Sequence, residues 1–121
     1  MAILIAGYET TATTSTYILW CVARYDSCRE RLRSDILNYG IESKYLDMFV
    51  KEAMRMYPAL PNFVIRTAHE DTKLAGYEIK RGTSIHMSVN TIHYDESIWP
   101  NPNVFQPERF AGGLVIHPLA D

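Results

Sequence analysis

LDMFVKEAMRMYP, residues 46–58, is the stretch that decides the fold, and it predicts one helix closed by a proline. Its apolar residues recur at steps of three and four, so they share one side of a helix. Ser43 is a suitable N-cap, Asp47 lies in the first turn, and Pro58 disfavours helical geometry at the residue before it. The apolar side consists of Leu46, Phe49, Val50, Ala53, Met54 and Tyr57.

Glu52 and Arg55 lie nearly opposite this apolar side. Residues at this spacing are neighbours on a helix surface, so the two side chains can form an ion pair. The helix alone predicts a solvated pair, which stabilises a protein by only about 0–1 kcal/mol. Stretches near both ends of the chain point to a different arrangement.

The composition fits one domain with a modest core. The chain has 121 residues, 47% of them hydrophobic, and a net charge of −2 without a basic tract, so we expect neither nucleic acid nor an anionic membrane surface as a partner. Two cysteines without CxxC spacing favour reduced thiols. No apolar run reaches the ~18–20 residues of a membrane span, and no signal-peptide pattern opens the chain.

Both ends of the sequence resemble cut ends. The chain is apolar from Met1 to Ala6 without a capping residue, and it stops in AGGLVIHPLAD without a closing helix or strand. Domain termini are usually exposed and loosely held. We therefore expect residues 1–121 to be a fragment of a single larger domain.

The remaining pattern predicts helices first and strands afterwards. Ile3–Arg24 predicts a helix of poor intrinsic propensity, and Ser27-x-x-Glu30 is a capping box that opens a second helix, which Gly40 closes. After Pro58 we expect short strands at 63–67 and 83–89, a hairpin over 74–79 turning near Gly76, a turn at 81–82, a helical turn at 90–94 and irregular chain over 95–110. The fold class is mainly α with a small β component (α+β).

Three motifs now identify a family. Ala6-Gly7-Tyr8-Glu9-Thr10-Thr11, Glu52-x-x-Arg55 and Pro107-Glu108-Arg109-Phe110 resemble, in order and spacing, the cytochrome P-450 monooxygenases. HYD at 93–95 and WPNP at 99–102 lie between them as the resemblance requires. It covers nearly the whole chain and implies a partial cytochrome P-450 fold of three helices, short strands and an irregular meander, without the N-terminal half and the cysteine loop.

The resemblance implies catalytic roles for Glu9 and Thr10 and haem b as the cofactor. Thr10 would hydrogen-bond dioxygen, and Glu9 would relay protons toward it, a pairing that suits ordered proton delivery. Ala6 and Gly7 would let the backbone approach the flat haem closely. The alternative is that the hydroxyls over 10–16 only pack, bonded to the preceding helical turn.

The resemblance also implies a structural network and two binding regions. Glu52 and Arg55 would form a buried network with Arg109, and the meander that carries Arg109 would cover the side of the helix opposite the apolar stripe. Arg66 would contact a haem propionate, because a guanidinium matches a carboxylate; an exposed strand arginine is the alternative. Phe63 and Val64 are candidates for the substrate pocket, although core packing explains them equally well.

One departure concerns the iron ligand. The family uses a cysteine thiolate in a loop after the Pro-Glu-Arg-Phe motif, and its electron donation favours cleavage of the oxygen–oxygen bond. Neither Cys21 nor Cys28 lies in that context, and His69, His86, His93 and His117 lack supporting spacing, so we assign no metal ligand in this chain.

Two functions follow from these patterns. The full-length parent is expected to be a haem-dependent monooxygenase that inserts one atom of dioxygen into a small apolar substrate, with electrons from a reductase, while this chain is inactive alone. The alternative is a non-enzymatic truncated remnant without haem chemistry. The location is open: the cytoplasmic side is expected, with or without an anchor in the endoplasmic reticulum membrane in the parent.

Overall fold

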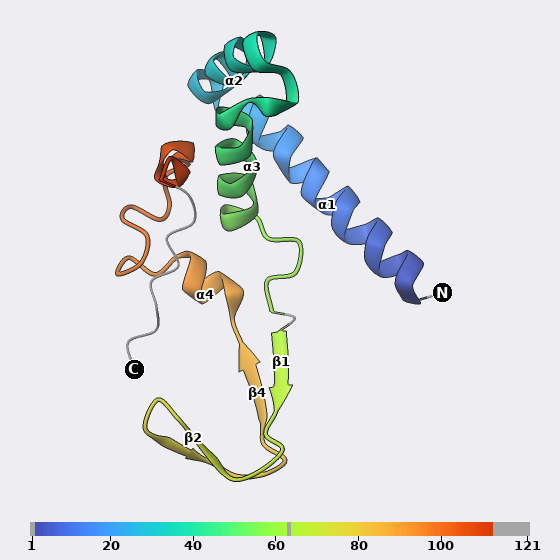
Figure 1. The fold of residues 1–121 in the computed structure, drawn as a ribbon, viewed down its shortest axis with the longest axis vertical. Helices are drawn as coiled ribbons and strands as arrows, with labels where there is room; N and C mark the ends of the chain where they lie inside the picture. The colour runs from blue at the N-terminus through green and yellow to red at the C-terminus, as the bar shows by residue number, and fades with distance from the viewer. Residues whose placement is uncertain (1, 63, 113–121) are drawn as a thin grey trace.

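The computed structural model describes residues 2–62 and 64–112, which separate into a helical end and a strand end, with α4 and the chain between α3 and β1 lying between them (Figure 1). The helices are α1 (Ala2–Arg24), α2 (Asp26–Tyr39), α3 (Lys44–Met56) and α4 (Val89–His93), with 3-10 turns η1 (Gly40–Glu42) and η2 (Pro107–Phe110). The strands are β1 (Val64–Thr67), β2 (Thr72–Leu74), β3 (Tyr77–Ile79) and β4 (Ser84–Met87). This confirms the mainly α class with short strands.

Helix α3 lies at the centre of the helical end, against α1, α2 and η2. Its predicted limits are confirmed to within two residues: the Ser43 hydroxyl accepts a hydrogen bond from the Leu46 backbone N–H at 3.0 Å, and Tyr57 leaves helical geometry just before Pro58. The buried core brings together residues from all three long helices and the meander. Its members are Cys21, Leu32, Tyr45, Phe49, Ala53, Met56 and Phe105.

The predicted capping box at the start of α2 is wrong. The helix begins at Asp26, so Ser27 lies inside its first turn, and the residue before the helix, Tyr25, makes no side-chain cap. The Tyr25 ring stacks on Phe105 at a centroid distance of 4.3 Å, so tertiary packing fixes the residue at which the helix begins. The predicted end is confirmed: Gly40 has φ +59° and donates its N–H to the Ile36 carbonyl.

The strand end consists of two antiparallel pairs that share no strand. β1 pairs with β4, and β2 pairs with β3 as the predicted hairpin. The hairpin turns at Ala75 and Gly76, both with positive φ (48° and 83°), as a tight two-residue turn requires. The sequence predicted a half-buried strand at 83–89, but in β4 only Ile85 is half-buried and the other residues are exposed. Val89 begins α4 and is not part of the strand.

The meander from residue 95 to η2 returns the chain to the helical end, where it lies beside α3 (Figure 1). It is irregular as predicted, except that Pro107–Phe110 form the 3-10 turn η2. Among the described residues, no helix combines the length and the apolar character that crossing a bilayer requires.

Candidate functional site

The centre of the candidate site is the Glu52–Arg55 pair on α3, and it is buried. Arg55 donates from Nε to Glu52 Oε2 at 2.8 Å and from Nη2 to Oε1 at 3.0 Å. The Glu52 and Arg55 side chains are 0% and 2% exposed. The solvated pair that the helix pattern alone favours is therefore wrong, because the meander covers this side of α3.

Arg109 of η2 completes the network from the opposite side. Its Nε donates to Glu52 Oε1 at 3.0 Å, and the backbone N–H of Gln106 donates to the same oxygen at 2.9 Å. One carboxylate thus accepts four hydrogen bonds, two of them bidentate from a guanidinium, which is the geometrically specific way to hold a buried charge. The structure brings together the three residues that the sequence grouped.

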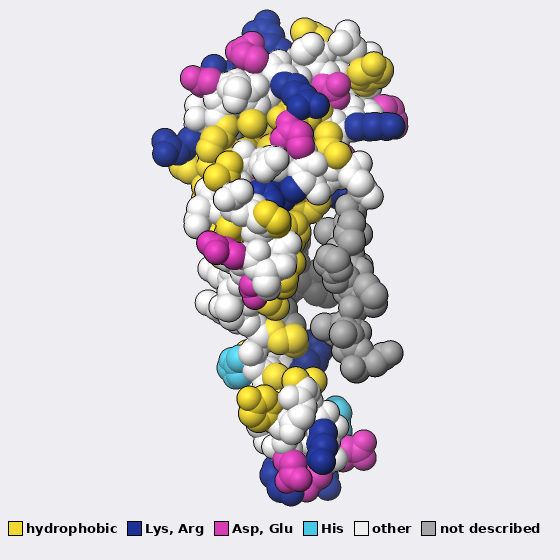
Figure 2. Space-filling view, turned by 90° about the vertical axis from the view of Figure 1, so that its left-hand side faces the viewer, with side chains coloured by type: hydrophobic (Ala, Val, Ile, Leu, Met, Phe, Trp, Pro, Cys, Tyr) yellow, Lys and Arg dark blue, Asp and Glu magenta, His cyan; other side chains and the backbone are white. Residues whose placement is uncertain are grey.

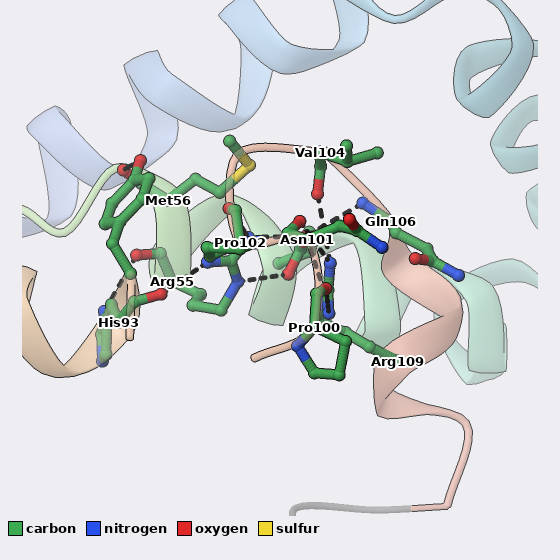
Figure 3. A network of polar contacts seen from close by, with 11 residues as sticks. Arg55, Met56, His93, Pro100, Asn101, Pro102, Val104, Gln106 and Arg109 are labelled. Carbon is green, nitrogen blue, oxygen red and sulfur yellow. Dashed lines mark hydrogen bonds and ion pairs between the residues drawn. The ribbon is translucent and has the colours of Figure 1, made fainter. Parts of the chain in front are cut away.

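Backbone carbonyls at the end of α4 and in the meander accept further hydrogen bonds from the two guanidinium groups (Figure 3). The acceptors are the carbonyl oxygens of His93 (2.6 Å) and Pro102 (2.8 Å) for Arg55, and of Pro100 (3.1 Å), Asn101 (3.4 Å) and Val104 (3.2 Å) for Arg109. Two arginines face one carboxylate, so these carbonyl dipoles compensate the excess positive charge. The network therefore fixes the path of the irregular chain as well as the charges.

Aromatic residues enclose Arg55. The rings of Tyr94 and Trp99 lie with their centroids 5.6 and 5.4 Å from the guanidinium carbon, within the range of cation–π attraction. The Tyr94 hydroxyl donates to the Met56 carbonyl at 2.8 Å, and burial raises the pKa of this phenol. The Trp99 indole Nε1 is buried without a hydrogen-bond partner among the described residues.

An apolar cavity of about 620 Å³ lies next to the network. Its lining comes from α1, from the end of α3 with the chain that follows it, and from α4, and it includes Arg55 and His93. Its other lining residues are Thr10, Thr11, Thr14, Ser15, Lys51, Met54, Pro58, Ala59, Leu60, Trp99 and Phe110. The cavity thus joins the first motif of the sequence to the second.

Of the predicted residues on α1, Thr10 lies on this cavity. Its hydroxyl donates to the Ala6 carbonyl at 2.7 Å, and Thr11 bonds the Gly7 carbonyl at 2.8 Å, the pattern of the packing alternative. The hydroxyl oxygen of Thr10 keeps its acceptor capacity. Ala6, Gly7 and Glu9 are exposed, and Glu9 does not line the cavity.

Arg66, the predicted propionate-binding residue on β1, is not among the residues that line the cavity. Arg66 is exposed, donates only to the Ile65 carbonyl at 2.9 Å, and forms no ion pair within the described ranges. Val64 pairs with Met87 across the β1–β4 ladder. Phe63 lies outside the described residues.

Neither cysteine is placed to bind a metal in the cavity. Cys21 is fully buried in the helical core, where burial and, secondarily, the Glu52 charge raise the pKa of its thiol to about 12. Cys28 is half-buried and does not line the cavity. His69 and His86 are exposed, His117 lies outside the described residues, and the described part of the chain holds no cluster of three metal-ligating side chains.

Several functional groups had no signal in the sequence. The carbonyls around the arginines come from backbone, which every residue type carries, so no pattern of side chains indicates them. The Asp35 carboxylate accepts hydrogen bonds from the Ser43 hydroxyl and from the Tyr45 N–H (3.2 Å), and no motif in the sequence singled it out. The prolines of the meander indicated only that this segment is irregular, so that its backbone groups need hydrogen-bond partners outside the segment.

Comparison with known proteins gives consistent matches. The family model described as cytochrome P450 matches residues 1–115. Thromboxane-A synthase of Rattus norvegicus is 36% identical over 88% of this chain and 22% of its own length, and cytochrome P450 3A41 of Mus musculus is 33% identical over 89% and 23%. The chain thus spans less than a quarter of these curated relatives.

Solved structures show the same likeness. A zebrafish cytochrome P450 determined with progesterone has a TM-score of 0.83 and 28% identity, over 89% of this chain and 28% of that one. The retinoic acid-bound cyanobacterial CYP120A1 superposes with a TM-score of 0.85 over 98% of this chain and 29% of that one. At 24% identity, the second match shows the fold alone.

Proposed function

The chain belongs to the cytochrome P450 family, and we propose that its full-length parent is a haem-dependent monooxygenase that inserts one atom of dioxygen into an apolar organic substrate. The observation that carries this proposal is the apolar cavity on which Thr10 of the first motif and Arg55 of the second both lie. Thr10 and Arg55, 45 positions apart in the sequence, both line this cavity, and Arg109 belongs to the buried Glu52–Arg55 network beside it.

The family implies haem iron as the cofactor, and the residues present fit such a group. A flat apolar ring needs an apolar site, which the cavity supplies, and a charged partner for its propionates. Our candidate for that partner is Arg66, which does not line the cavity and forms no ion pair among the described residues. Ala6, which carries only a methyl group, and Gly7, which has no side chain, are exposed on α1, with open space beside Gly7. When bound, the haem supplies the site at which dioxygen is activated.

We assign the proton chemistry to α1. Thr10 lines the cavity, and we propose that its hydroxyl exchanges its bond to the Ala6 carbonyl for one to dioxygen, because a hydroxyl rotates to suit its partner. Glu9 precedes it on the exposed surface and can take protons from solvent. Glu52, Arg55 and Arg109 have no part in proton transfer; their role is to hold the meander against α3.

The alternative is a non-enzymatic product without haem chemistry. It is favoured by the positions of the cysteines, since buried Cys21 resists forming a thiolate and neither Cys21 nor Cys28 reaches the cavity. A working parent must therefore supply its thiolate from another part of its chain. The monooxygenase and the non-enzymatic product thus differ in whether a cysteine thiolate is present to bind the haem iron.

Partners follow from the family and stay proposals for the parent. Apolar substrates, dioxygen and a reductase that donates electrons are expected, and one relative, the zebrafish protein, was determined with progesterone, an apolar molecule. Phe63 and Val64 remain our candidates for substrate contacts. We expect the parent on the cytoplasmic side, with or without an anchor in the endoplasmic reticulum membrane. The full sequence of the parent distinguishes these two arrangements.

The test begins with the transcript, sequenced beyond both ends of the chain. If it encodes a cysteine loop in frame, the complete protein is expressed and its haem content is measured by absorbance. Arg55→Ala is expected to abolish haem incorporation, whereas Arg33→Ala, an exposed arginine of α2, is expected to leave it unchanged. Thr10→Ala is expected to keep the haem and lose product while dioxygen is still consumed. A transcript confined to this chain, with no haem bound, would establish the non-enzymatic alternative.

A further inference from the structure

The η2 turn is held from two sides by neighbouring residues. Arg109 reaches inward to Glu52 on α3, while Glu108 reaches outward to Arg31 on α2, with Nη1 2.5 Å from Oε1. The two contacts differ in burial: the Glu52 side chain is fully buried, whereas Arg31 and Glu108 are 57% and 40% exposed. Figure 2 shows oppositely charged side chains interspersed over this upper part of the molecule.

The geometry of a 3-10 turn couples the two contacts. With three residues per turn, consecutive side chains point about 120° apart, so the direction of Glu108 determines that of Arg109. A rotation of η2 that releases Glu108 from α2 therefore also moves the Arg109 guanidinium relative to Glu52. Pro107 and Phe110, the other residues of the turn, are buried and anchor its position without contributing charge.

Arg31 is itself held in place. Its guanidinium carbon lies 4.4 Å from the centroid of the Tyr45 ring, within the range of cation–π attraction. Tyr45 is a buried residue at the start of α3. One turn further along α2, Asp35 accepts hydrogen bonds from the Tyr45 N–H and the Ser43 hydroxyl. The same face of α2 thus fixes the beginning of α3 and presents Arg31 to η2.

We infer that Arg31 is a positioning residue of the buried network: its ion pair with Glu108 sets the rotation of η2 and thereby holds Arg109 on Glu52, a residue that Arg31 does not touch. The network then has five charged members, from Arg31 through Glu108, Arg109 and Glu52 to Arg55. This inference rests on the contacts of the described chain and not on haem chemistry, so it stands or fails independently of the proposed function.

The test observes Arg109 directly, by NMR exchange of its Nε–H proton with solvent in the full chain. Arg31→Gln removes the charge and keeps most of the side chain, and we expect the Arg109 proton to exchange about fivefold to tenfold faster, as a coupling between linked contacts predicts. Arg33→Gln, on the same helix without an ion pair among the described residues, is the matched control and is expected to change nothing. The Arg55 Nε–H, held by its own bonds, is expected to respond less.

A charge exchange supplies the second arm. Arg31→Glu alone places two carboxylates together and should speed exchange at Arg109, while Arg31→Glu combined with Glu108→Arg should restore its protection. An Arg109 proton that exchanges at the unmodified rate in Arg31→Gln would overturn the inference and leave Arg31–Glu108 an isolated surface pair. Equal acceleration in Arg33→Gln would overturn it too, because the effect would then be one of general charge.

Discussion

The helical end and the strand end of this molecule are stabilised in opposite ways. At the helical end, α3 holds a fully buried carboxylate that is bonded by residues 3, 54 and 57 positions away in the sequence. At the strand end, the exposed Asp71 carboxylate is bonded by Lys80 Nζ at 2.9 Å and the Arg81 N–H at 2.8 Å, 9 and 10 residues away. The Glu52 carboxylate accepts four hydrogen bonds in a buried site, and the Asp71 carboxylate accepts two at the surface.

The difference shows what burial adds to an ion pair. Removing one partner of a buried pair leaves an uncompensated charge in a poorly polarisable interior, whereas water replaces a lost partner at the surface. The same contrast holds for packing: Phe49 is fully enclosed by the core, while Ile65 of β1 is 46% exposed. The two ends should therefore respond unequally to matched substitutions.

The largest effect is expected from Glu52→Ala. It leaves Arg55 and Arg109 buried without their carboxylate, which should lower the free energy of unfolding by about 3–5 kcal/mol. The measurement is urea unfolding followed by circular dichroism, with the exposed Glu96→Ala as a control expected to stay within about 0.5 kcal/mol. Equal unfolding midpoints for the two variants would show that burial does not determine the cost of losing a carboxylate in this molecule.

A smaller loss is expected from Ser43→Ala. The variant removes the N-cap of α3, whose hydroxyl accepts from the Leu46 N–H and donates to Asp35, and should cost about 1–2 kcal/mol. The same urea experiment measures it, with Ser34→Ala on the exposed side of α2 as the control. A loss no greater than that of the control would mean that packing alone fixes where α3 begins.

At the strand end we expect a gain from Ala75→Asn. Ala75 has φ +48°, a conformation that costs most residues about 1–2 kcal/mol and that asparagine tolerates, so the hairpin should gain about 0.5 kcal/mol. Amide hydrogen exchange of the Lys73–Glu78 pair measures hairpin opening. Gly76→Ala, at φ +83°, should have the opposite sign. Faster exchange in Ala75→Asn would contradict the assigned turn.

The smallest effect concerns pH. The Arg81 N–H and then the Lys80 ammonium hold the pKa of the Asp71 carboxyl below its ordinary value. A lowered pKa in the folded state means that the carboxylate stabilises the hairpin above its unfolded pKa, and that this contribution is lost as the pH falls through the folded pKa. Carboxyl NMR titration should show the lowered value, partly restored upward in Lys80→Ala.

Asp95 is the internal control for this titration. Its pKa is also lowered, but by its own bonds to the Ser97 hydroxyl and N–H, so Lys80→Ala should leave it unchanged. An Asp71 that titrates at the ordinary value in the unmodified chain would show that the hairpin contacts do not persist in solution.

By itself, the sequence determined the local features of this protein. The position of α3, its Ser43 cap, the Gly40 stop and the hairpin turn near Gly76 all follow from short-range rules, because each depends on residues within one or two turns. The motifs also identified the family. Where a local rule failed, at Ser27, packing of Tyr25 on Phe105 from the far end of the chain outweighed a cap of about 1 kcal/mol.

Only the tertiary structure decided whether the Glu52–Arg55 side of α3 meets water. The periodicity of the helix places that pair opposite its apolar stripe and predicts exposure, and the covering segment is an irregular meander about 50 residues later. Its backbone carbonyls make the burial of two arginines possible. Because every residue type carries such a carbonyl, the sequence does not indicate these acceptors. Contacts of this kind depend on which distant segment packs against the helix, and a local sequence pattern does not specify that segment.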